Sequence, residues 1–116
     1  ELRVVCVESD LRKATFLRTV FRETGVPAKV IARRIEEIPP QGADVLSARA
    51  LAPLDKLLCH AERHLDAGGT ALFPKGAGHR REIEEAQQKW AFDIEEKPSE
   101  TEPDAAILSI GGIQRV

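Results

Sequence analysis

A short apolar run that ends abruptly in an acid constrains this 116-residue chain more than any other feature. Residues Val4 to Val7 are mostly β-branched, and such a run predicts a strand that is buried on both faces of a parallel sheet. From Leu11 to Thr24 the apolar residues recur at helical spacing, so a helix is expected directly after the strand. The two segments predict a strand–helix unit with Glu8 at its junction.

Glu8 is the first candidate functional residue, because open parallel sheets bind ligands outside the carboxyl ends of their strands. An ionised carboxylate at that point can accept hydrogen bonds from both hydroxyls of a ribose. The alternative is an acid that only favours the dipole at the start of the following helix. These residues alone leave both interpretations open.

The rest of the chain alternates between the two kinds of segment. Further strands are expected at 29–32, 44–48 and 70–73, and helices from Pro53 onward and over 80–90. Two final strands, near 92–94 and 105–110, have no helix between them, which favours an antiparallel hairpin. We therefore predict a single α/β domain over residues 1–116, with a doubly wound and mostly parallel sheet.

Composition argues against a membrane-spanning protein and against binding of polyanions by bulk charge. Apolar residues make up 42% and charged residues 31%, as in globular proteins, and no apolar run reaches the roughly 20 residues of a membrane span. Cys6 and Cys59 fall inside predicted elements and favour buried thiols in a reducing compartment, so we expect a cytoplasmic protein. The net charge of −2 means that any polyanion partner must bind a local basic patch.

Four sequence blocks then occur in order, at 7–18, 33–39, 47–52 and 73–76. The most specific are Ser-Ala-Arg-Ala, which starts at Ser47, and Phe-Pro-Lys-Gly, which starts at Phe73. Together the blocks resemble the 16S ribosomal RNA guanine-N7 methyltransferases, also called glucose-inhibited division protein B, over essentially the whole chain. The resemblance implies a Rossmann-like fold that depends on S-adenosylmethionine, in which the closing antiparallel hairpin is expected.

The resemblance also implies a cofactor site. Glu8 matches the acid that contacts the ribose of S-adenosylmethionine, and Ile35 and Glu36 match the pair that flanks the adenine. Arg49 matches an arginine near the methionine end of the cofactor and the entering guanine. Guanine N7 already presents a lone pair, so the reaction needs alignment more than a catalytic base, and no catalytic residue is assigned.

For the substrate, the resemblance implies 16S ribosomal RNA or the small ribosomal subunit. Separately, we expect no membrane partner and a monomeric protein. Lys75 matches a lysine that contacts a backbone phosphate, and Arg34 is carried over as a substrate-binding residue beside the adenine pair. Arg80 and Arg81 fit either an RNA-binding patch or an ordinary solvated face.

The sequence departs from the family in one respect, because the glycine-rich loop and the central first strand do not occur in it. We therefore expect an incomplete domain with half of the cofactor site and unpaired strand edges. A nicotinamide-dependent oxidoreductase half-domain and a non-catalytic remnant are the alternatives. His60 and His64 have a spacing that can share a metal ion, but we expect histidines that are solvated or at the helix end and no metal site.

Overall fold

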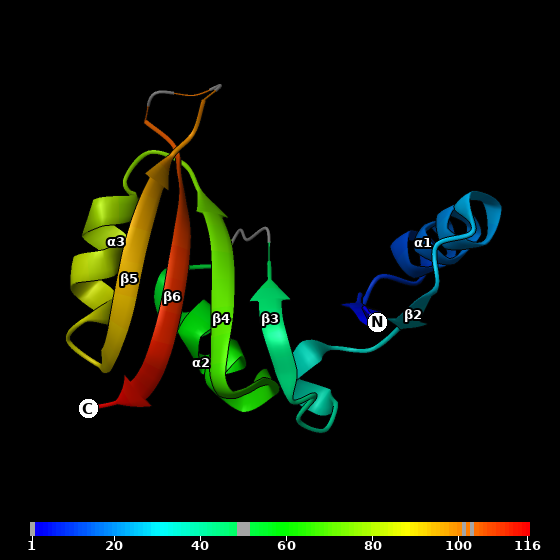
Figure 1. The fold of residues 1–116 in the computed structure, drawn as a ribbon, viewed down its shortest axis with the longest axis horizontal. Coiled ribbons are helices and arrows are strands. Elements are labelled where there is room, and N and C mark those ends of the chain that lie inside the picture. The colour runs from blue at the N-terminus through cyan, green and yellow to red at the C-terminus, as the bar shows by residue number, and fades with distance from the viewer. Residues whose placement is uncertain (1, 49–51, 101, 103) are drawn as a thin grey trace. The chain divides into compact units, whose positions relative to one another are not determined.

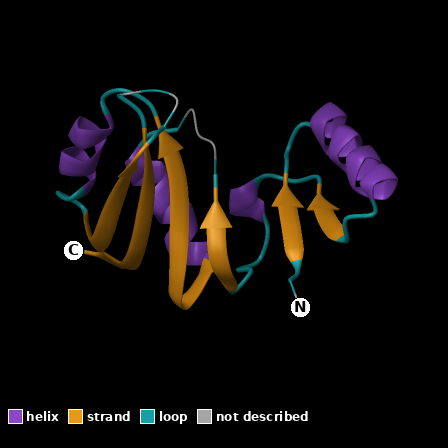
Figure 2. Cartoon of the chain, turned by 45° about the horizontal axis from the view of Figure 1, so that its top comes forward, coloured by secondary structure: helices purple, strands orange, loops and turns teal. Residues whose placement is uncertain are grey.

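The computed structural model describes residues 2–48, 52–100, 102 and 104–116. The chain divides into two compact units, residues 1–39 and residues 40–116, and each is described by itself (Figure 1). The strands form two separate sheets, drawn in orange in Figure 2, with two strands in the first unit and four in the second. None of the helices in the described ranges is both long and apolar enough to cross a membrane.

The first unit is a strand–helix–strand arrangement that ends in a short helical turn. Its elements are β1 (Val4–Val7), α1 (Leu11–Thr24), β2 (Ala28–Ile31) and the 3-10 helix η1 (Ile35–Glu37). β1 and β2 are parallel, with Cys6 opposite Val30. The predicted strand–helix unit is confirmed, and both strands end at the same edge of their sheet.

α1 has the predicted limits because the sequence supplies a cap at each end. The Asp10 carboxylate accepts hydrogen bonds from the backbone N–H groups of Arg12 (2.9 Å) and Lys13 (3.3 Å). Gly25 closes the helix at a φ of 73°, a left-handed conformation that glycine adopts without strain. Along the inner face Ala14 is fully buried, whereas Leu11, which the periodicity placed on that face, is 69% exposed.

The second unit consists of a four-stranded sheet and two helices. Its elements are β3 (Ala43–Ser47), α2 (Leu54–His64), β4 (Leu65–Lys75), α3 (His79–Ala86), β5 (Trp90–Pro98) and β6 (Ala106–Arg115). The strand order is β3-β4-β6-β5, with β3 parallel to β4 and β6 antiparallel to both neighbours. The expected α/β fold with a C-terminal antiparallel hairpin is confirmed.

The core of the second unit lies between the sheet and its two helices, which Figure 1 shows behind and beside the strands. α2 contributes an apolar face in which Leu54, Leu58 and Ala61 are fully buried. The facing sheet contributes Phe73 and Leu108, which are also fully buried. Burial of each large apolar side chain contributes roughly 1.5–3 kcal/mol, so this packing is the main source of the unit's stability.

β4 is longer than the sequence pattern suggested. Leu65 pairs with Ala43 and Thr70 pairs with Val45, so four residues of β4 stand opposite one residue of β3. Residues 66–69, which precede the expected strand at 70–73, therefore form an irregular bulge inside β4. Gly68, at a φ of 83°, supplies the backbone conformation that such an irregularity needs.

Trp90 begins β5, whereas helical periodicity had extended the third helix to it. α3 ends at Ala86, and the indole Nε1 of Trp90 donates to Oδ1 of Asp55 in α2 at 2.8 Å. The Arg115 guanidinium lies over the indole ring, 4.4 Å from its centroid. Trp90 is buried, and its contacts with α2 and β6 decide its position and outweigh the local helical pattern.

The described strands form two separate sheets. β1 hydrogen-bonds to β2, and β3 hydrogen-bonds to β4. Within the described ranges the other edge of β1 and the other edge of β3 have no ladder partner.

Replacing Asp55 by alanine should lower the free energy of unfolding by about 1–3 kcal/mol. The substitution leaves the buried indole N–H of Trp90 without its acceptor, and an unsatisfied buried donor costs about that much. Urea unfolding of the two proteins, followed by Trp90 fluorescence, measures the difference. Asp44→Ala, an exposed aspartate on β3, is the control and should change stability by less than about 0.5 kcal/mol. Equal effects of the two substitutions would contradict the assignment.

The contribution of Asp55 should also depend on pH. Hydrogen bonds from Trp90 and then Lys89 hold the pKa of the Asp55 carboxyl below its ordinary value of 3.8. A lowered folded-state pKa stabilises the fold above the unfolded pKa, and that stabilisation is lost as the pH falls through the folded value. The stability difference between the wild type and Asp55→Asn should therefore be constant from pH 6 to 7 and shrink below about pH 4. A difference that grew on acidification would have the wrong sign.

Candidate functional site

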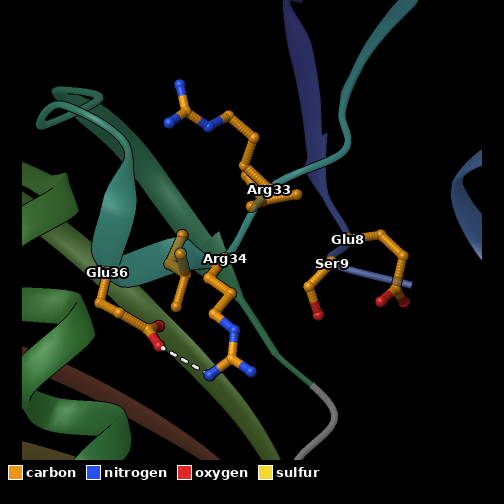
Figure 3. A pocket seen from close by; sticks show the side chains of 7 residues that line it. Glu8, Ser9, Arg33, Arg34 and Glu36 are labelled. Carbon is orange, nitrogen blue, oxygen red and sulfur yellow. Dashed lines mark ion pairs between the residues drawn. The ribbon is translucent and has the colours of Figure 1, made fainter. Parts of the chain in front are cut away.

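A pocket lies at the carboxyl ends of the two parallel strands of the first unit (Figure 3). It is lined by Val7, Glu8, Ser9, Arg33, Arg34, Ile35 and Glu36. The backbone N–H of Glu8 donates to the carbonyl of Ile31 at 3.0 Å, so the ladder runs one residue beyond β1. This ladder places the Glu8 side chain where the strand ends, as predicted.

The Glu8 carboxylate is partly fixed by its own turn. Its Oε2 accepts a hydrogen bond from the backbone N–H of Asp10 at 3.1 Å. In the described part of the chain Oε1 has no hydrogen-bond partner, and neither Arg33 nor Arg34 forms an ion pair with Glu8. Such an acceptor, held by one oxygen and open at the other, fits a ribose diol.

The turn that follows β2 brings Ile35 and Glu36 to the same pocket. Arg34 precedes η1, and its Nη1 lies 3.8 Å from Oε1 of Glu36, with both side chains more than half exposed. Figure 3 shows these two side chains directed toward each other, while Arg33 points the opposite way. Ile35, between them in sequence, is half-buried and supplies an apolar surface.

Two of the lining residues, Ser9 and Arg33, were not singled out from the sequence. Each is adjacent in sequence to a residue that was, so proximity to Glu8 or Arg34 is the signal that would have found it. Arg33 is exposed and adds a second guanidinium at the rim of the pocket. The pocket therefore combines two acids, two arginines and an apolar strip.

Arg49 lies outside the described residues, so only its place in the sequence is known. Lys75 lies at the end of β4, in the second unit, and only 6% of its side chain is exposed. Its Nζ donates to the carbonyl oxygen of Ala52 and to Oε1 of Glu82, each at 2.9 Å. The ammonium is directed into the protein rather than toward solvent.

Glu82 was not identified from the sequence, and one oxygen of its carboxylate accepts two hydrogen bonds. The same Oε1 that accepts from Lys75 also accepts from the backbone N–H of Leu54 at 3.0 Å. Leu54 is the first residue of α2, and Pro53 before it provides no side-chain cap. Nothing in the sequence links Glu82 to Leu54, because they are 28 residues apart and meet only in the fold.

Near the start of α3, Arg80 and Arg81 are exposed, whereas His79 is half-buried. Arg81 forms an ion pair with Glu85 one turn along the helix, at 3.5 Å. His79 contacts Glu96 at 3.1 Å through Nε2 and the Gly76 carbonyl at 3.2 Å through Nδ1. A solvated helix face with local pairing fits Arg81 at least as well as an RNA patch.

His64 is the last residue of α2, which agrees with the helix-end alternative, and it is buried rather than solvated. His60, one turn earlier, is half-buried. In the ranges that the structure describes, no group of three histidine, cysteine, aspartate or glutamate side chains is arranged to hold a metal ion.

Sequence comparison connects this arrangement to known proteins. The family model described as GidB, rRNA small subunit methyltransferase G, matches residues 1–105. The chain is 53% identical over 116 residues to the ribosomal RNA small subunit methyltransferase G of Ruegeria sp. and 54% identical to that of Cereibacter sphaeroides. Both matches cover 100% of this chain but only 57% and 56% of the relatives, so the chain spans little more than half their length.

Solved structures support the fold. A TehB-like SAM-dependent methyltransferase from Corynebacterium glutamicum superposes with a TM-score of 0.68 at 16% identity, covering 94% of this chain and 67% of that one. A structure described as a putative rRNA-methylase from Clostridium thermocellum gives a TM-score of 0.63 at 12% identity, covering 98% and 73%. The expected Rossmann-like methyltransferase fold is thereby confirmed.

The family resemblance seen in the four sequence blocks is confirmed independently by the family model and by the relatives. Glu8 and residues 33–39 lie inside the matched region, as do the other two blocks. With a match over residues 1–105 and about half of all positions shared with curated relatives, the chain belongs to the GidB family, that of rRNA small subunit methyltransferase G.

Proposed function

We propose that the protein transfers a methyl group from S-adenosylmethionine to N7 of a guanine in 16S ribosomal RNA. The observation that carries this proposal is the pocket at the end of β1 and β2, in a chain of the GidB family. In that pocket Glu8 takes the ribose hydroxyls, while Ile35 and Glu36 take the adenine.

The residues of the pocket suit these roles for chemical reasons. The open Oε1 of Glu8 is a charged acceptor, and hydrogen bonds to charged groups are stronger than neutral ones. The half-buried Ile35 offers an apolar surface for a ring, and the Glu36 carboxylate can accept from an exocyclic amine. Arg34 already pairs with Glu36 at 3.8 Å, so it can orient that carboxylate or turn to a phosphate.

The reaction makes modest demands on the protein. S-adenosylmethionine supplies an electrophilic methyl group when it is bound. Guanine N7 has an available lone pair, so the protein has no proton to remove and no general base to provide. Its side chains have to hold the two partners in line and exclude water, which is catalysis by proximity and orientation. On the family resemblance, we assign Arg49 to the methionine end of the cofactor and the entering guanine.

We further propose that this chain is one part of a methyltransferase domain whose other part carries the first strand and a glycine-rich loop. Two observations support this. The curated relatives are longer than the chain, which covers 57% of the Ruegeria protein. In addition, β1 and β3 each have one edge without a ladder partner among the described residues, and unpaired backbone groups are costly when buried.

The proposed partner is 16S ribosomal RNA, either free or in the assembled small subunit, and we propose a monomer that acts in the cytoplasm. The names of the relatives refer to small-subunit ribosomal RNA. Cys6 and Cys59 are free thiols, which is compatible with a reducing compartment. Target choice then depends on phosphate contacts and RNA shape, since the chain has only four Phe and one Trp for base stacking.

Replacing Glu8 by alanine should weaken binding of S-adenosylmethionine by about 1–3 kcal/mol, the cost of losing a charged hydrogen-bond acceptor. Calorimetric titration of the intact protein with S-adenosylmethionine, and separately with NAD, measures this effect and the choice of cofactor. Glu23→Ala is a matched control on α1, exposed and outside the pocket, and should leave the affinity unchanged. Binding of NAD alone by the wild type would overturn the methyltransferase proposal.

Replacing Arg34 by glutamine should weaken binding of 16S ribosomal RNA and lower the salt slope of log affinity by about 1, as expected for one lost phosphate contact. Affinity for S-adenosylmethionine should change little, because the ion pair between Arg34 and Glu36 is exposed and weak. Arg22→Gln, in the last turn of α1, removes the same charge outside the pocket and is the control. Equal losses in both variants would mean that only overall charge matters.

A further inference from the structure

The first two turns of α1 present two cations and an aromatic ring on one exposed surface. Arg12 and Lys13 are exposed, and Phe16 is 67% exposed. On a helix, residues three and four apart are neighbours, so Phe16 lies beside both Lys13 and Arg12. Phe16 and Arg12 are on the side of the helix opposite the fully buried Ala14. We call Arg12, Lys13 and Phe16 the α1 patch.

Local helix stability gives no reason for the two cations of the patch. The N-terminus of a helix carries a partial positive charge, which disfavours basic side chains in the first turn. The first turn of α1 nevertheless contains no acid and holds Arg12 and Lys13. Among the described residues neither side chain has an ion-pair partner, whereas Arg34 of the same unit pairs with Glu36. An anionic partner would supply the counter-charge that the fold does not.

The charge of the chain is unevenly divided in favour of this region. Residues 1–39 carry eight Lys and Arg against six Asp and Glu, whereas residues 40–116 carry nine against thirteen. Within α1 (Leu11–Thr24) the basic residues outnumber the acidic ones by four to one. A polyanion is attracted to local positive charge, so in a chain with a net charge of −2 the first unit is the more favourable place for it to bind.

Phe16 gives the patch a group that recognises bases as well as phosphates. The four Phe and the one Trp all lie in the described ranges, and Phe16 is the exposed one among them. An exposed ring flanked by cations suits unpaired RNA, whose bases stack on aromatic side chains while its phosphates bind the cations. A double helix would offer phosphates but no free base for the ring.

The patch adjoins the proposed cofactor pocket within the same unit. Glu8 and Ser9 line the pocket, and Asp10, the next residue, caps α1. The hydrogen bond from the backbone N–H of Arg12 to the Asp10 carboxylate, at 2.9 Å, holds the first turn of the helix next to the end of β1. RNA that presents a guanine to the bound cofactor can therefore reach the α1 patch with nearby nucleotides.

We propose that the α1 patch binds unpaired ribosomal RNA close to the target guanine, with Phe16 stacked on a base and Arg12 and Lys13 on phosphates. This inference rests on the proposed function and names a surface that holds its substrate. It is distinct from the contact expected of Arg34, because Arg34 lines the pocket and the α1 patch lies outside it. The patch adds affinity without touching the reacting atoms, so its loss raises KM for RNA and leaves kcat unchanged.

The first experiment measures binding of 16S ribosomal RNA to the intact protein at several salt concentrations. Arg12→Gln combined with Lys13→Gln should lower the salt slope of log affinity by about 2, one for each lost phosphate contact. Arg22→Gln combined with Lys29→Gln removes the same charge from exposed positions of the same unit and is the control. Equal slopes in the two double variants would overturn the proposal, because α1 would then have an ordinary solvated face.

Two substitutions of Phe16 decide whether a base or a protein segment covers the ring. If the ring stacks on a base, Phe16→Leu should weaken RNA binding roughly 5- to 100-fold, whereas Phe16→Trp keeps an aromatic face and should retain the wild-type affinity. If another part of the protein covers Phe16, the larger indole should lower Tm more than leucine does, and RNA affinity should be equal in the two variants. That second pattern would overturn the proposal.

Cofactor binding keeps this inference separate from the proposed function. The three patch residues do not line the pocket, so affinity for S-adenosylmethionine should be the same in the wild type and in all these variants. A wild-type protein that binds RNA but neither binds S-adenosylmethionine nor transfers a methyl group would refute the proposed function alone. The comparison of RNA affinities needs no cofactor and would still decide whether the α1 patch holds RNA. A wild-type protein that does not bind 16S ribosomal RNA would overturn both.

Discussion

The packing of α2 against the middle of the four-stranded sheet is the interaction on which the second unit depends. Leu54 and Leu58 are fully buried against strands that contribute Phe73 and Leu108. Burial of apolar surface is not directional, so it holds the helix on the sheet without fixing its position along the strands. The polar contacts at the first turn of α2 supply that precision, because hydrogen bonds require defined distances and angles.

The partners in these contacts come from distant parts of the chain. At the first turn of α2, Glu82 accepts the amide of Leu54, and Asp55 accepts the indole N–H of Trp90. These bonds join α2 to α3 and to the start of β5, and through the ring of Trp90 to Arg115 near the end of β6. α2 therefore contributes both apolar side chains to the core and the hydrogen-bonding groups that connect it to α3 and β5.

In the first unit, the pocket is formed by two short stretches of sequence that directly follow β1 and β2. Glu8 lies one residue beyond β1, and residues 33–36 follow β2 after a single residue. Two parallel strands that end at one edge bring these stretches together whatever the rest of the chain does. That is why Glu8, Ile35 and Glu36 were found from sequence blocks alone, and why Ser9 and Arg33 needed only adjacency to be noticed.

The sequence by itself determined the limits of α1, the strand–helix alternation, the closing hairpin and the family. Each of these depends on neighbouring residues, such as the Asp10 cap and Gly25, or on a pattern that repeats along the chain. Only the tertiary structure decided that Trp90 begins a strand and that Lys75 is buried against Glu82. The partners of these two side chains include Asp55, 35 residues from Trp90, and Ala52, 23 residues from Lys75. Hydrogen bonds over such separations leave no periodic trace in a sequence, because they exist only once helices and sheet have packed.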